Sequence, residues 1–177
     1  MSTDNSTTLT KIVSGGQTGV NRGALDAALT AGFPCGGWCP ADRRAEDGPI
    51  PQRYPLMPLP GGGYRDRTRQ NVIDSDGTAI LFYESLRGGT KLTRDVCVRE
   101  KKPFIVLDAK LTDAAAIVRF IDENQFSVLN VAGPRLSGWA EGYAFALAVL
   151  GGVIAQAILI STKRNLLHEQ SLAADPT

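Results

Sequence analysis

Short apolar runs alternate with longer helical patterns along most of the 177-residue chain. The apolar runs, typical of strands covered on both faces, are residues 11–14, 36–39, 78–83, 104–107 and 126–131. The helical patterns are residues 20–31, 65–74, 88–101 and 111–123, and a final long helix starts near residue 138. This alternation predicts a parallel sheet with helices on both faces, as a single Rossmann-like three-layer α/β domain.

The two ends of the chain depart from this pattern. Residues 1–10 are rich in Ser, Thr, Asp and Asn. They lack a basic start and an apolar core, so we expect a disordered polar N-terminus and not a signal peptide. We expect the ligand-binding domain to span residues 11–160, followed by a polar C-terminal tail over residues 161–177.

Residues 143–160 are the most apolar segment of the chain, with Gln156 as the one polar side chain. The length just suffices for a membrane span. However, Gly151-Gly152 interrupts the run, and the other elements describe a soluble sheet. We therefore expect a buried helix, closely packed at these glycines, that lies between the sheet and a second subunit of a homo-oligomer.

Composition narrows the classes of function. Nineteen basic and eighteen acidic residues give a net charge of +1, without the basic excess of a nucleic-acid-binding protein. The three cysteines have no close zinc spacing and indicate buried thiols in a reducing, cytoplasmic compartment. The single histidine, His168, argues against histidine-based triads and multi-histidine metal sites. We therefore assign no catalytic residue and no metal ligand.

Glycine is the one residue type in clear excess, and many of the 19 glycines lie at strand ends. Three turns leave a predicted strand and enter a helix, at residues 14–19, 87–90 and 133–135. Glycine lets backbone N–H groups approach a ligand, and helix N-termini attract anions. Because ligands of parallel sheets bind beyond the carboxyl ends of the strands, we expect these turns to hold a phosphate.

The residues that we assign to this anion site come from the turns and from nearby cationic or aromatic positions. They are Gly15, Gly16, Gln17, Thr18, Gly19, Gly88, Gly89 and Thr90, with Arg22, Arg43 and Arg135 for charge and Trp38 to shape the pocket. Neither a P-loop lysine nor a clean dinucleotide fingerprint accompanies the first turn. Each turn taken alone is also compatible with a tight strand-to-helix connection that binds nothing. Trp38 is also compatible with a buried position in the core. Gly16→Val is expected to abolish anion binding and to leave the protein folded.

Other polar residues leave alternatives open. Asp74, Asp76 and Glu84 lie near the third predicted strand and suit either acid–base chemistry and metal binding or simple capping and turn roles. Arg65, Arg67 and Arg69 lack interleaved aromatic residues and are typical of a solvated helix start.

Several of these segments resemble the molybdenum carrier proteins, which are related to the molybdenum cofactor carrier proteins. The matching segments, in the family's order, are SGGQTGVNR (14–22), GGWCP (36–40), RRAEDGPIP (43–51), NVIDSDGT (71–78), GGT (88–90) and LNVAGPR (129–135). They cover most of the domain, and as a set they are specific. The wider group includes the cytokinin-activating nucleotide hydrolases once called lysine-decarboxylase-like.

The resemblance implies a Rossmann-like, usually oligomeric protein that holds molybdenum cofactor non-covalently before a molybdoenzyme acceptor receives it. This cofactor is a pterin (molybdopterin) with a terminal phosphate and a dithiolene-bound molybdenum oxo centre, which glycine-turn amides and an arginine rim suit. Asn21 departs from the aspartate of many relatives, and Thr93 stands where the hydrolases have their catalytic glutamate.

The sequence therefore favours a carrier of a phosphorylated small molecule, with no role for nucleic acid and with membrane contact as the less favoured interpretation of the last helix. Two alternatives remain. One is a phosphoribohydrolase-like enzyme that uses Asp74, Asp76 or Glu84, and the other is a nucleotide-sensing module that changes its assembly state when occupied.

Overall fold

Six parallel strands form the central sheet of the computed structural model, which describes residues 9–173. Their order is β5 (Leu56–Pro58), β2 (Cys35–Cys39), β1 (Lys11–Val13), β8 (Val128–Ala132), β6 (Gly77–Phe82) and β7 (Phe104–Asp108). The short strands β3 (Arg44–Ala45) and β4 (Gly48–Pro49) form a separate antiparallel hairpin. The expected disordered terminus falls largely on residues 1–8, which lie outside the described residues.

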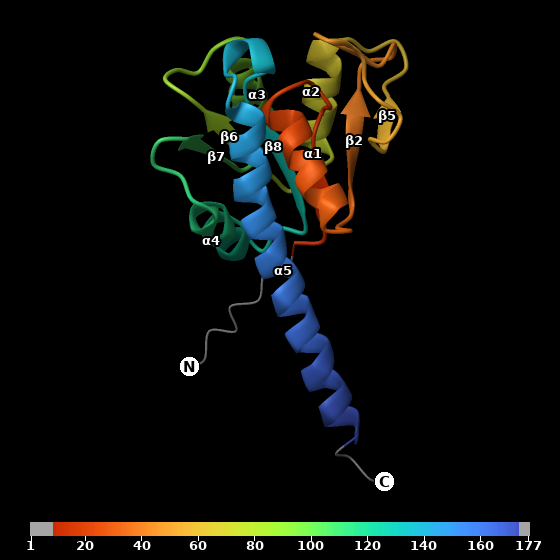
Figure 1. Cartoon of the computed structure of the whole chain (residues 1–177), viewed down its shortest axis with the longest axis vertical. Coiled ribbons are helices and arrows are strands. Elements are labelled where there is room, and N and C mark those ends of the chain that lie inside the picture. Colours follow the sequence, from red (N-terminus) through yellow and green to blue (C-terminus); the bar gives the residue numbers. More distant parts are fainter. Residues whose placement is uncertain (1–8, 174–177) are drawn as a thin grey trace.

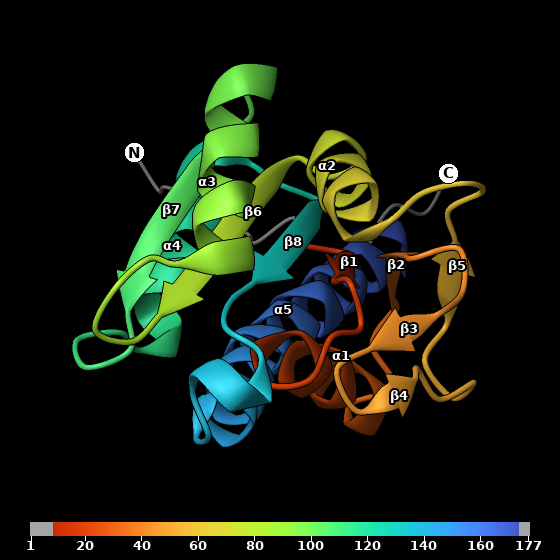
Figure 2. The ribbon, with the colours of Figure 1, turned by 90° about the horizontal axis from the view of Figure 1, so that it is seen from above.

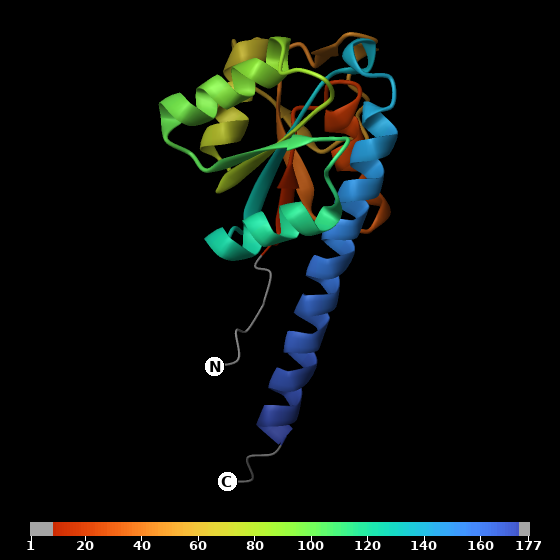
Figure 3. The ribbon, with the colours of Figure 1, turned by 90° about the vertical axis from the view of Figure 1, so that its left-hand side faces the viewer.

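Helices cover both faces of the sheet (Figures 1 and 3). One face carries α1 (Val20–Thr30), α4 (Ala114–Asn124) and α5 (Gly142–Ala173), and the other carries α2 (Tyr64–Ile73) and α3 (Gly88–Glu100). A 3-10 turn, η1 (Leu136–Gly138), precedes α5. The predicted three-layer α/β fold with a parallel sheet is thus confirmed.

The apolar core lies mainly between the sheet and the layer of α1, α4 and α5. Ala79 and Leu81 of β6 are fully buried there and belong to the same cluster as Ile117 and Ile121 of α4. Because side chains of a strand alternate between its two faces, this spacing follows directly from the apolar run of β6. A smaller cluster around Val72, on α2, fills the opposite face.

The last helix, α5, extends well beyond the domain (Figure 1). Its first half buries Ala146, Leu150 and Ile154 in the core, whereas Leu159 is about half exposed. By length and composition α5 suffices to cross a membrane, and 33% of its most apolar window is buried. The helix continues through residues 161–173, where the sequence suggested a polar tail.

The two adjacent glycines in the middle of α5, Gly151 and Gly152, differ in their surroundings. A Cβ on Gly152 would lie 2.9 Å from the Cβ of Ala114, so the close packing expected there is present. A Cβ on Gly151 would meet nothing within 4 Å. Within the single chain, Gly151 therefore makes no close contact.

The strand order fixes where a ligand can enter. The chain runs from β1 to β2 and β5 on one side of the sheet and from β6 to β7 on the other, and β8 then inserts between β1 and β6. The loops beyond the carboxyl ends of β1, β8 and β6 are therefore neighbours (Figure 2). Such a point of reversed strand order is where open α/β sheets bind ligands.

Candidate functional site

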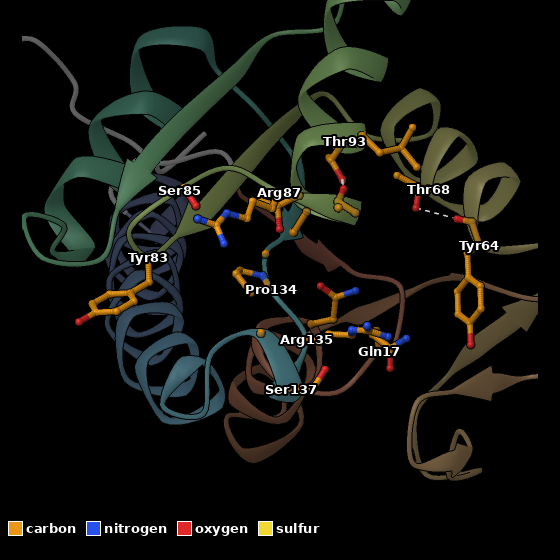
Figure 4. Close-up of a pocket in the computed structure, with 18 of the residues that line it drawn as sticks. Gln17, Tyr64, Thr68, Tyr83, Ser85, Arg87, Thr93, Pro134, Arg135 and Ser137 are labelled. Atoms are coloured by element: carbon orange, nitrogen blue, oxygen red, sulfur yellow. Dashed lines mark hydrogen bonds between the residues drawn. The ribbon is translucent and has the colours of Figure 1, made fainter.

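A cavity of about 600 Å³ opens at this edge of the sheet. Its walls come from the β1–α1 turn, the start of α2, the β6–α3 connection and the segment after β8. Tyr64 and Tyr83 lie at opposite ends of it, and Gln17 and Arg135 lie between them (Figure 4). Its volume lies within the range of small-molecule sites.

The N-terminus of α3 borders the cavity. Gly88, Gly89 and Thr90 all line it, as the sequence predicts for this turn. No side chain caps the helix, and its first turn carries no acidic residue. The unpaired N–H groups and the partial positive charge of α3 are therefore available to an anion in the cavity.

The first glycine turn contributes less backbone to the cavity than expected. Gln17 lines the cavity, and Gly15 lines a recess of about 10 Å³ behind it. Gly16 and Gly19, by contrast, pack against protein, because a Cβ on them would lie 2.3 Å from Leu56 Cδ1 and 2.6 Å from the carbonyl oxygen of Pro134.

This geometry contradicts the expectation that Gly16→Val leaves the protein folded. Gly16 has φ = 73°, a conformation that a β-branched residue strongly disfavours. Valine would also overlap the Leu56 side chain. The substitution tests folding and not anion binding.

Glu46 of the β3–β4 hairpin connects three segments around the cavity. Its carboxylate accepts hydrogen bonds from the Thr18 hydroxyl, from the Ser137 hydroxyl at 2.6 Å and from the Ser137 amide at 3.1 Å. Arg135 Nε lies 3.3 Å from it. Burial alone would raise the pKa of Glu46, but the bonds from Ser137 and Thr18 and the charge of Arg135 outweigh it and lower the pKa. Thr18 is thus engaged within the protein, while Arg135 still lines the cavity.

Three further residues of the predicted site lie away from the cavity lining. Arg22 donates to Asp47 at 2.8 Å and to the Gly16 carbonyl at 3.1 Å, and this arginine lowers the pKa of Asp47. Trp38 donates from its indole nitrogen to Asp74 at 2.7 Å. Arg43 donates to four backbone carbonyls, those of Ile50, Pro51, Tyr54 and Leu56. These side chains hold the loops together.

Two residues that the sequence analysis did not select line the cavity with unpaired polar atoms. Nε of Arg67 and Oδ1 of Asn21 are buried and have no hydrogen-bond partner among residues 9–173. Burial lowers the pKa of Arg67 to about 10. The sequence of α2 could have pointed to Arg67, because this helix has few apolar residues. A helix that covers a sheet with so few apolar residues must bury polar ones.

The three candidate acidic residues lie in different parts of the structure. Glu84 lines the cavity, whereas Asp74 accepts from Trp38 and Gln70. Asp76 accepts hydrogen bonds from the backbone amides of Ser127 and Val128, at the start of β8 and thus at the amino edge of the sheet.

Within the described ranges, no group of three or more His, Cys, Asp or Glu residues is arranged to hold a metal ion. The thiols of Cys35, Cys39 and Cys97 are free, and burial raises the pKa of each.

Comparisons with known proteins agree with this architecture. A crystal structure of the protein named Putative molybdenum carrier protein, from Syntrophus aciditrophicus SB, is 40% identical, with a TM-score of 0.78. The match covers 82% of this chain and 94% of that one. No curated protein matches significantly. Residues 12–154 match the Circularly permutated YpsA SLOG family. The chain belongs to this family.

Proposed function

We propose that this protein is a carrier that binds a phosphorylated heterocyclic cofactor non-covalently in the cavity. The observation that carries this proposal is the uncapped N-terminus of α3 at a cavity of about 600 Å³, at the point where strand order reverses. The name of the similar protein from Syntrophus aciditrophicus favours molybdenum cofactor as the ligand.

The residues present suit such a ligand. The amides of Gly88 and Gly89 and the hydroxyl of Thr90 would bind one anionic group, since the Thr90 amide itself donates to the Arg87 carbonyl at 3.1 Å. Gln17 and Arg135 would contact the ligand from the opposite wall. Gly15, Gly16, Thr18, Gly19, Arg22, Arg43 and Trp38 would support that wall through the contacts described above.

The chain's own residues would bind, orient and shield the cofactor. Tyr64, which is 40% exposed, lies at one end of the cavity and would offer an aromatic ring to a heterocycle. Tyr83, at the other end, instead stacks on Trp139, and Lys110 lies over its ring. The molybdenum centre and its redox chemistry would belong to the cofactor itself. The proposal further includes a homo-oligomer formed through the exposed side of α5 and, in the cytoplasm, transfer to a molybdoenzyme acceptor.

One observation favours a second candidate function. Glu84 is the single carboxylate among the described residues that line the cavity, and its φ of 63° is unusual for a glutamate. An acid at this place would suit hydrolysis of a nucleotide. A nucleotide-sensing module would use the same cavity without turnover.

Gly89→Asp tests the carrier proposal, with molybdenum cofactor released anaerobically from a molybdoenzyme as the probe. A Cβ at Gly89 meets nothing within 4 Å, so the variant should fold. Its carboxylate would occupy the free N–H groups of α3 and repel an anion, and we expect affinity to fall about tenfold or more. Fluorescence titration of the pterin measures this loss.

The control is Gln52→Glu, which adds the same charge at an exposed position outside the cavity lining and should bind like the wild type. A wild-type protein that does not retain the cofactor would contradict the carrier proposal. If the wild type hydrolyses nucleoside 5′-monophosphates and Glu84→Gln does not, the protein is a nucleotide hydrolase and not a carrier.

A further inference from the structure

The inner end of the cavity holds two buried polar atoms that no described residue satisfies. Nε of Arg67 is a hydrogen-bond donor, and Oδ1 of Asn21 is an acceptor. Both residues line the cavity and also the recess of about 10 Å³ behind it. Buried polar atoms in folded proteins nearly always have partners, so this pair indicates a place that a ligand completes.

Arg67 supplies a positive charge without a counter-charge. Its guanidinium lies against the backbone of Gly15, where a Cβ would be 1.6 Å from Nη1. No carboxylate of the described chain pairs with it, and the groups that act on its charge are Tyr64 and Cys39. A planar guanidinium in this setting is suited to an oxyanion.

Asn21 restricts which oxyanion fits. It lies in the first turn of α1 and is 5% exposed, so its Oδ1 has little access to water. A carbonyl oxygen repels a fully deprotonated oxyanion such as sulfate but accepts a hydrogen bond from a phosphate that retains a P–OH group. A phosphate monoester retains that proton up to about pH 6, and inorganic phosphate carries one at neutral pH.

The neighbouring hydroxyl groups already have partners. Thr68 donates to the carbonyl of Tyr64 at 2.8 Å, and Thr93 donates to the carbonyl of Gly89 at 2.9 Å. Arg67 and Asn21 hold the two buried side-chain polar atoms that lack a hydrogen-bond partner among residues 9–173.

We propose that Arg67 and Asn21 form a phosphate-recognition pair, in which Arg67 binds an anionic oxygen and Asn21 accepts a hydrogen bond from the P–OH group. The proposal rests on the proposed function in one respect, because it takes the cavity as the ligand site. It places the terminal phosphate of the ligand at the inner end. The N-terminus of α3 then serves a second anionic group.

Titration of the full-length protein with inorganic phosphate and with sulfate, at pH 6 and constant ionic strength, tests the pair. We expect calorimetry to show phosphate binding at least about tenfold tighter than sulfate. Arg67→Met should weaken phosphate binding by about tenfold or more. Asn21→Leu should remove the preference for phosphate over sulfate. Arg65→Met, which removes an exposed charge of the same helix, should retain wild-type affinity.

Gly15→Ala is a second route to the same result. It keeps the arginine but displaces its guanidinium, because the nearest atom to the new methyl group is the flexible end of Arg67. Phosphate affinity should fall as in Arg67→Met. Wild-type affinity in both variants, or equal affinity of the wild type for phosphate and sulfate, would overturn the pair.

Two further comparisons distinguish a phosphate ester from free phosphate, and the phosphate-recognition pair from the carrier proposal. Ribose 5-phosphate that binds more tightly than inorganic phosphate supports the terminal phosphate of a larger ligand, whereas weaker binding overturns that part and leaves free phosphate. Phosphate binding that requires Gly89 but not Arg67 overturns the pair and leaves the carrier proposal intact. Phosphate binding that requires Arg67, in a protein that does not retain molybdenum cofactor, supports the pair and contradicts the carrier.

Discussion

Gly23→Ala is expected to lower the free energy of unfolding by about 3 kcal/mol, because it overpacks the contact between α1 and α5. A Cβ on Gly23 would lie 2.4 Å from the carbonyl oxygen of Tyr143 and 2.9 Å from the Cβ of Ala146. The first of these atoms is backbone, so relief requires the two helices to separate. Urea denaturation followed by circular dichroism measures the change.

Gly151→Ala is the matched control in the partner helix. A Cβ at Gly151 meets nothing within 4 Å, and alanine is the better helix former. This variant should raise the free energy of unfolding by about 0.5–1 kcal/mol. A stabilising effect of Gly23→Ala would contradict the close approach of α1 and α5.

Arg67→Met is expected to raise the stability of the ligand-free protein by about 1–3 kcal/mol, although it removes a residue of the proposed site. The gain follows from burial, because Nε of Arg67 is enclosed without a partner and burial lowers the pKa of this arginine to about 10. The penalty of the buried charge is complete at every pH below that value, and it falls progressively as the pH rises from there toward the ordinary pKa of an arginine. Methionine fills similar space without a charge.

Urea denaturation in phosphate-free buffer at pH 7 measures this effect, and Arg65→Met should leave stability unchanged. Added phosphate should then stabilise the wild type but not Arg67→Met. A loss of more than about 1 kcal/mol in ligand-free Arg67→Met would assign the arginine a structural role instead.

Periodicity predicted those elements that have a buried apolar face. The run at β6 and the amphipathic spacing of α4 led directly to their place in the core. Strand β5 and the β3–β4 hairpin were missed, because they lie in or beside a proline-rich stretch where Leu56 is the buried member of a three-residue strand. The pairing of β5 depends on β2, which local pattern does not encode. Strands β3 and β4 pair with each other, but two residues each are too few to show a strand period.

The sequence located the candidate site better than it identified the groups in it. Gln17, the α3 turn and Arg135 do line one cavity, because parallel strands bring their carboxyl ends to one edge. Which side chains remain free there depends on distant partners. Glu46 engages Thr18, and Asp47 engages Arg22, whereas Arg67 of a polar helix has no such partner.

Native mass spectrometry of the protein from a molybdenum-replete host, with metal analysis of the same sample, tests the central claim most directly. The cavity and its anion-binding groups predict a non-covalent adduct with the mass of a phosphorylated pterin, accompanied by molybdenum. Cavity variants such as Gly89→Asp should lose the adduct. A nucleotide mass in its place, or no adduct from a molybdenum-replete host, would contradict the carrier account.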